Sequence, residues 1–121
     1  MEAKLNRIVI KGGNYTDAAA ISRLIRDAGA EPGEADAEEL ALYANALGET
    51  VADDDACHVD LFVMQKGDES FLCANLYAIY LTFNDPSHTL PALRAIVDAA
   101  DFMSCRAVDG DVFVVQFRFL I

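Results

Sequence analysis

The C-terminal segment constrains the fold most, because Asp109-Gly110 separates two β-prone runs there, Ser104 to Val108 and Val112 to Leu120. An Asp-Gly pair between such runs predicts a tight hairpin turn. Side chains alternate in the second run, so that one face carries Phe113, Val115, Phe117 and Phe119 and the other Val112, Val114, Gln116 and Arg118. This period of two predicts an antiparallel sheet that is covered on one face.

One strand and two helices are expected in the first part of the chain. Leu5 to Ile10 is β-prone, and an amphipathic helix follows, with Thr16 as its N-cap and Gly29 after its last turn. A second helix is expected to begin with an Asp36–Glu39 capping box and to end at Gly48.

Another hairpin and a third helix are expected in the middle of the chain. The strands are Cys57 to Lys66 and Phe71 to Phe83, joined by a turn at Gly67-Asp68. Thr89 is expected to cap the helix, with Pro91 near its first position. The buried stripe of this helix is predicted to be Leu93, Ile96, Val97 and Ala100.

The resulting order is β-α-α-β-β-α-β-β, and a chain of 121 residues suits a single domain, residues 1–121. Because 54% of the residues are hydrophobic, the chain can build a core and is not a disordered acidic tail. The predicted class is α+β, with helices on one face of a mostly antiparallel sheet. Its more specific form is a ferredoxin-like core with an inserted acidic helix and an additional C-terminal strand.

The charge is concentrated in one segment. The chain has 20 Asp and Glu against 9 Lys and Arg, which gives a formal net charge of −11. Eleven of the acids lie between Asp27 and Gln65, where no Lys or Arg occurs, and the rest of the chain has as many bases as acids. Such a block is either a solvated face or a surface whose field attracts a basic partner. The residues predicted to bind that partner are Glu31, Glu34, Asp36, Glu38, Glu39, Glu49, Asp53, Asp54 and Asp55.

Composition also excludes several classes of function. So acidic a chain lacks the basic surface needed for direct contact with nucleic acid or an anionic membrane. It has no run of about 18 apolar residues that would span a membrane, and its first residues, Met-Glu-Ala-Lys-Leu, lack the apolar run that is typical of a secretory signal. Cys57, Cys73 and Cys105 lie in apolar stretches, so we expect buried, reduced thiols in the cytoplasm of a bacterial host.

The sequence contains no motif for catalysis, a metal or a cofactor. Cys57-His58 has no second cysteine at zinc spacing, and Asp53-Asp54-Asp55 lacks the alternating ligands of a calcium loop. His58 is expected to be a satisfied sheet residue and His88 to be solvated, while Lys11-Gly12-Gly13 lacks the phosphate-binding glycine patterns. We therefore predict a protein that is not an enzyme and that binds no cofactor or metal.

In its size, its charge and its acids from Glu31 to Asp55, the chain resembles the small acidic inhibitors of phages and mobile elements, chiefly anti-CRISPR proteins and other DNA mimics. The resemblance implies an inhibitor that presents carboxylates to the basic nucleic-acid groove of a protein or nucleoprotein effector, such as a CRISPR surveillance complex. The resemblance assigns no family's functional residues to positions in this sequence.

Two alternatives stay open. The same electrostatics suit an immunity protein or antitoxin that blocks a basic toxin. A low pI with an α/β sandwich also resembles the small acidic secretion chaperones, although those begin with a helix and this chain begins with a strand. The chaperone or adaptor alternative predicts a homodimer formed through surfaces around Val112, Val114 and Tyr80.

Overall fold

A computed structural model describes residues 7–11, 14–31, 34–51, 56–79 and 86–121. Within these residues the elements follow the predicted order β-α-α-β-β-α-β-β, and the α+β class is confirmed. Their bounds are β1 Arg7–Ile10, α1 Ala18–Asp27, α2 Glu34–Thr50, β2 His58–Lys66, β3 Glu69–Ile79, α4 Pro86–Ala99, β4 Phe102–Asp109 and β5 Val112–Leu120.

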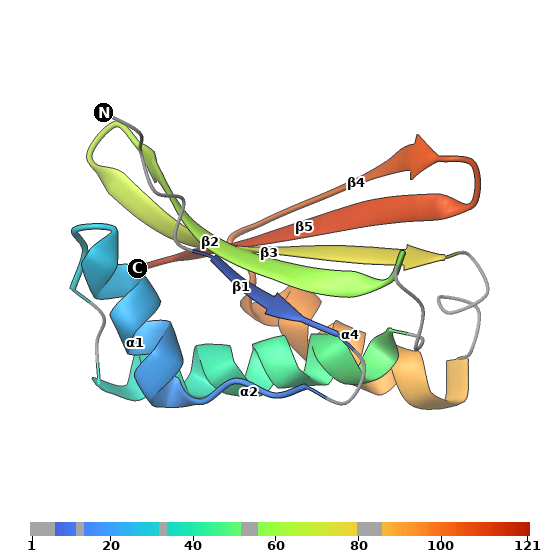
Figure 1. Ribbon diagram of the computed structural model, residues 1–121, viewed down its shortest axis with the longest axis horizontal. Helices are drawn as coiled ribbons and strands as arrows, with labels where there is room; N and C mark the ends of the chain where they lie inside the picture. Colours follow the sequence, from blue (N-terminus) through green and yellow to red (C-terminus); the bar gives the residue numbers. More distant parts are fainter. Residues whose placement is uncertain (1–6, 12–13, 32–33, 52–55, 80–85) are drawn as a thin grey trace.

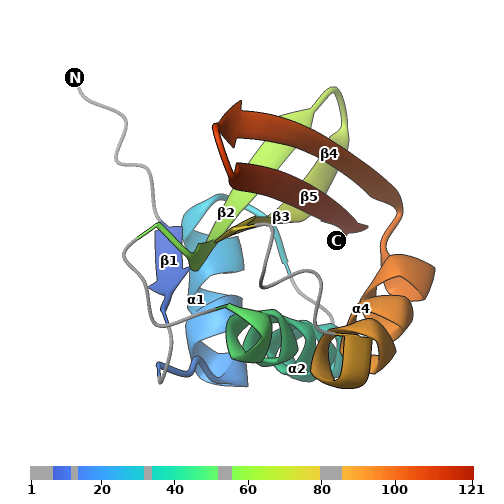
Figure 2. The same ribbon diagram turned by 90° about the vertical axis from the view of Figure 1, so that its right-hand side faces the viewer.

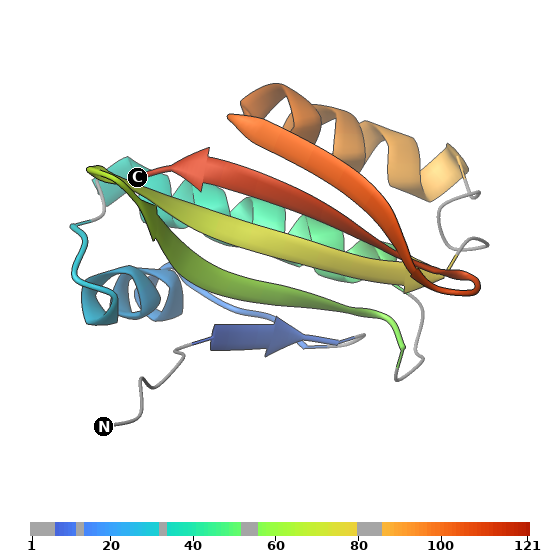
Figure 3. The ribbon, with the colours of Figure 1, turned by 90° about the horizontal axis from the view of Figure 1, so that it is seen from above.

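The strands of the described chain form one antiparallel sheet in the order β1-β2-β3-β5-β4 (Figure 3). Both predicted hairpins are present, β2–β3 and β4–β5. Because Asp109 pairs with Val112, the turn residues of the second hairpin are Gly110 and Asp111, one position later than predicted, and Gly110 has a φ of +49°, the left-handed backbone that favours glycine. At the other edge β1 pairs with β2, with Ile10 opposite Val59. The ferredoxin-like prediction is therefore wrong, because a split βαβ core separates the strands before and after its first helix by another strand.

The described helices all lie on one face of the sheet, with α2 between α1 and α4 (Figures 1 and 2). The core lies between this helix layer and the sheet, and Val115, Phe117 and Phe119 of β5 point into it as predicted. Phe113 is only half-buried, and Val114 is also buried although it lies on the opposite face. No described element covers the opposite face, which we call the uncovered face. The largest fully buried side chains include Ile10, Ile21, Leu47, Leu61, Leu72, Leu76, Ile96 and Phe117.

The N-cap of α1 is one residue later than predicted. The carboxylate of Asp17 accepts a hydrogen bond of 2.8 Å from the backbone N–H of Ala20, which makes Asp17 the N-cap. Thr16 is held by a tertiary contact instead. Its N–H donates to Oδ1 of Asn45 at 3.0 Å, and its carbonyl accepts from Nδ2 of Asn45 at 2.8 Å. A local capping preference is thus overridden by a contact between Thr16, just before α1, and Asn45 of α2.

Both ends of α2 also differ from prediction. The helix begins at Glu34, so Asp36 lies within it and the capping-box prediction is wrong. It continues past Gly48 to Thr50. Gly48 is buried, and a Cβ added there would lie 2.7 Å from Cγ2 of Ile10. Close approach of β1, and not a helix stop, therefore requires glycine at this position.

The third predicted helix begins earlier than expected, at Pro86 and not near Thr89. Its apolar stripe is only partly covered. Ile96 is fully buried and Leu93 is half-buried, but Val97 is 41% exposed. Helix α4 therefore contacts the core through a narrower face than its sequence pattern indicates.

Strand β4 is exposed from Phe102 to Val108. The prediction that all three cysteines are buried is wrong for Cys105, which lies on this strand. It is confirmed for Cys57 and Cys73, both free and buried. Burial raises the pKa of the Cys73 thiol to about 11, against a smaller opposing effect of Arg118, so this thiol stays protonated and is a poor nucleophile.

Candidate functional site

Helix α2 and the loop before it expose five of the acids predicted to bind a partner. These are Glu31, Asp36, Glu38, Glu39 and Glu49. Glu34 begins α2, but its side chain lies outside the described residues. Asp53, Asp54 and Asp55 lie outside the described residues altogether.

One solvent-facing side of α2 carries both charge and an apolar centre. At about 100° per residue, Glu38, Leu42 and Glu49 fall within about 40° of one another around the helix, and all three are exposed. Glu39 and Ala46 lie beside them, and we call these five residues the α2 face. Leu42 is 70% exposed. Leu42 was not among the predicted binding residues, although its position off the buried stripe of the helix indicates exposure.

The α2 face is acidic along its whole length. Glu38 and Glu49 are about 16 Å apart along the axis, at 1.5 Å per residue. No Lys or Arg occurs in α2 to offset their charge. The face therefore presents carboxylates at both ends and a large apolar side chain between them.

Asp60 belongs to the acidic block of the sequence but not to this surface. It lies on β2, is 5% exposed, and places Oδ2 at 2.6 Å from Nη2 of Arg7. Its Oδ1 is buried and has no hydrogen-bond partner in the described part of the chain. Asp60 thus forms a structural ion pair on the uncovered face and is not available to a partner.

Glu39 is held in place by Tyr43. The hydroxyl of Tyr43 donates a hydrogen bond of 2.5 Å to Oε1 of Glu39, and its ring stacks on Phe119 with centroids 5.6 Å apart. This hydrogen bond, with burial and the negative charge of Glu39, raises the pKa of Tyr43, so the phenol stays protonated. A cavity of about 100 Å³ beside it is also lined by Asp36 and Asp101. It contains acids and a phenol but no nucleophile with an adjacent base.

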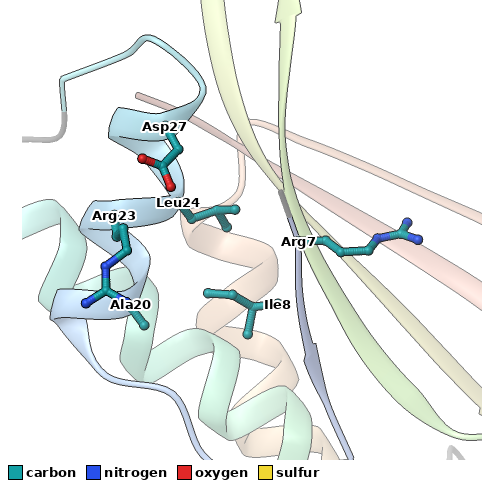
Figure 4. A pocket seen from close by; sticks show the side chains of 6 residues that line it. All are labelled: Arg7, Ile8, Ala20, Arg23, Leu24 and Asp27. Atoms are coloured by element: carbon teal, nitrogen blue, oxygen red, sulfur yellow. The ribbon is translucent and has the colours of Figure 1, made fainter. Parts of the chain in front are cut away.

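A second cavity, of about 200 Å³, lies between β1 and α1 (Figure 4). Ile8 and Leu24 form its apolar part, and Arg23 and Asp27 stand along α1. Figure 4 shows the side chain of Arg7 directed away from α1, consistent with its ion pair to Asp60. This cavity brings together no catalytic set of groups.

His58 lies on the uncovered face, where its ring stacks on Tyr77 with centroids 4.5 Å apart. Its Nδ1 is buried without a hydrogen-bond partner among the described residues, so the prediction of a satisfied sheet histidine is wrong for this atom. Burial lowers the pKa of His58 more than the negative charge of Asp60 raises it, and Lys11 and Arg7 lower it further. The ring of Tyr77 is thereby engaged by His58.

Replacement of His58 by phenylalanine is expected to remove an acid-dependent loss of stability. Because the pKa of His58 is lowered on folding, the unfolded chain binds this proton more tightly, and the contribution of His58 present above about pH 6.5 declines as the pH falls. Urea midpoints at pH 7 and pH 5 should therefore differ less for His58→Phe than for wild type. An equal fall in both proteins would contradict this assignment.

The surface predicted for a homodimer is only partly accessible. Val114 is 4% exposed, so its side chain is not available to a second copy. Val112 is half-buried, and Tyr80 lies outside the described residues.

The described residues contain no group of three or more metal-binding side chains. None of the described helices is long and apolar enough to cross a membrane. Comparisons with protein-family models, with curated proteins and with solved structures gave no match.

Proposed function

We propose that the protein is a non-enzymatic inhibitor that binds a basic, nucleic-acid-binding effector through the α2 face. The observation that carries this proposal is the position of Leu42, 70% exposed at the centre of a helix face whose charged side chains are all carboxylates. A single exposed leucine is ordinary on a protein surface. An apolar centre within a charged rim is the usual anatomy of a protein interface.

Electrostatics favour a basic partner. A net charge of −11, with exposed carboxylates on α2 and in the loop before it, produces a field that accelerates encounter with a basic groove. Grooves of this kind occur in proteins that bind nucleic-acid phosphates. Occupation of such a groove by α2 would exclude the nucleic acid, which is the inhibitory step of the proposal. Leu42 would anchor the helix in an apolar pocket of the partner. Carboxylates that only imitate phosphates would need no such apolar anchor.

The proposal is tested by affinity capture from a bacterial lysate with two charge-matched variants. Glu38→Lys/Glu49→Lys reverses the charge at both ends of the α2 face, and Asp98→Lys/Asp111→Lys reverses two exposed acids elsewhere. We expect wild type to retain a nucleic-acid-binding protein at about 0.05 M salt and to release it at about 0.5 M, where charges are strongly screened. The α2 variant should retain at least about tenfold less, and the control variant should behave as wild type.

Two results would contradict the proposal. One is equal loss of capture by both variants, which would show attraction to net charge without a defined surface. The other is a captured protein whose binding to nucleic acid is unaffected by saturating amounts of this chain.

A further inference from the structure

The uncovered face of the sheet contains a cavity of about 270 Å³ that the proposed function does not use. Three adjacent strands, β3, β5 and β4, form it, so its walls are built on paired backbone. It is lined by Asn75, Ser104, Arg106, Val114, Gln116 and Arg118.

A β-bulge brings Arg106 to this face. The first pair after the turn is Asp109 with Val112. If the register continued unbroken from this pair, Arg106 would lie opposite Val115, on the helix-covered face of the sheet. The register shifts between Ala107 and Asp109, so that Arg106 pairs with Val114 instead. One additional residue in β4 thus turns this guanidinium to the side of the sheet that carries Arg118.

Among the described residues, the two arginines of the cavity have no carboxylate partner. Nε of Arg118 donates to Oε1 of Gln116 at 2.7 Å, and Nε2 of Gln116 donates to Oδ1 of Asn75 at 2.8 Å. These two hydrogen bonds orient Arg118 through its Nε and do not use its terminal nitrogens, which can donate to another acceptor. Within the described part of the chain no carboxylate forms an ion pair with Arg106 or Arg118. Two guanidiniums that line one cavity suit a carboxylate.

The free edge of β4 borders the same cavity. Strand β4 pairs with β5 on one side only, and Figure 1 shows it at the outside of the sheet. Phe102 and Met103 point to opposite faces of the sheet, yet are 56% and 53% exposed. Half of the backbone N–H and C=O groups of an edge strand point outward without a partner strand. The regular part, Phe102 to Ala107, offers about 20 Å of edge, enough for a peptide of about six residues.

We propose that an extended acidic segment of another protein adds to the sheet along β4 and places a carboxylate between Arg106 and Arg118. A strand added there would turn every second side chain to the uncovered face, next to Ser104 and within reach of Arg106. Charge complementarity selects an acidic segment, and the exposed apolar side chains of β4 suit the β-branched residues between its acids. This site lies on the opposite side of the sheet from the α2 face. It binds an acidic partner, whereas the α2 face binds a basic one.

The test is a titration of ¹⁵N-labelled full-length protein with two blocked heptapeptides, TVEVEVT and its glutamine counterpart TVQVQVT. We expect the glutamate peptide to bind at least about tenfold more tightly and to shift the amide signals of β4 together with those of Gln116 and Arg118. Arg106→Gln should weaken this binding by at least about tenfold. Arg94→Gln, at an exposed arginine of α4, should leave it unchanged.

Three outcomes would overturn the proposal. Equal affinity for the two peptides would remove the role of the arginines. Shifts confined to the cavity, reproduced by succinate without movement of the β4 amides, would identify a site for small anions. A β4-mediated dimer in sedimentation equilibrium that the glutamate peptide does not dissociate would assign the edge to a second copy of the chain.

Discussion

Replacement of Phe117 by alanine is expected to lower the free energy of unfolding by about 3–5 kcal/mol. Phe117 is 1% exposed and lies on β5, between Ala74 of β3 and Met103 of β4, with its ring directed into the core. The loss combines the transfer free energy of a large aromatic side chain with the cavity that remains. Because domains of this size are stable by about 5–15 kcal/mol, the variant should unfold at a much lower urea concentration.

Phe102→Ala is the matched control for this prediction. It removes the same atoms from an edge-strand position that is 56% exposed, where the ring makes an edge contact with Phe71 at a centroid distance of 5.7 Å. Its loss should be clearly smaller, about 1–2 kcal/mol, because more than half of the ring is exposed and the aromatic pair adds about 0.5–1.5 kcal/mol to the effect of its buried area. Similar losses in the two variants would show that β5 is not the centre of the core.

Gly48→Ala is expected to destabilise the protein by about 1–3 kcal/mol, although alanine is the better helix former by about 1 kcal/mol. The added methyl group would approach Cγ2 of Ile10 to 2.7 Å, and Ile10 is itself 1% exposed and β-branched, so it cannot rotate away freely. The sign of the effect, measured by urea unfolding, therefore separates tertiary packing from helix propensity.

A double-mutant cycle locates the cause of this loss. Ile10→Ala removes Cγ2, so in that background Gly48→Ala should be neutral or stabilising. Ile10→Val keeps both γ carbons and should give no such rescue. A stabilising effect of Gly48→Ala in the wild-type background would contradict the close approach of β1 to α2.

The predictable part of the fold was the part that local pattern determines. The alternation in Val112–Leu120 predicted which face of β5 is buried, and the Asp-Gly turn predicted its hairpin. The N-cap of α1 was one residue off because a tertiary contact outweighs a local capping preference, as the two hydrogen bonds between Thr16 and Asn45 show. Gly48 was interpreted as a helix stop because its contact with Ile10, which is close in space but distant in sequence, leaves no local signal.

The candidate sites divide in the same way. The exposure of Glu38, Leu42 and Glu49 follows from helical spacing and was within reach of the sequence. The exposure of β4 could not be predicted from the sequence, because β4 is an edge strand only through the order of the strands in the sheet. The juxtaposition of Arg106 with Arg118 depends on a one-residue bulge, which reverses the face of every residue beyond it.

The most direct test of the proposed function is the dissociation constant of the captured effector, measured across a range of salt concentrations. For wild type we expect the affinity to fall steeply with salt, and for Glu38→Lys/Glu49→Lys a weaker affinity with a shallower dependence on salt. Leu42→Ala should weaken binding by about tenfold and leave the salt dependence unchanged, because it removes apolar contact and no charge. A partner bound by all three proteins with the same affinity and the same salt dependence would show that the α2 face is not its binding surface.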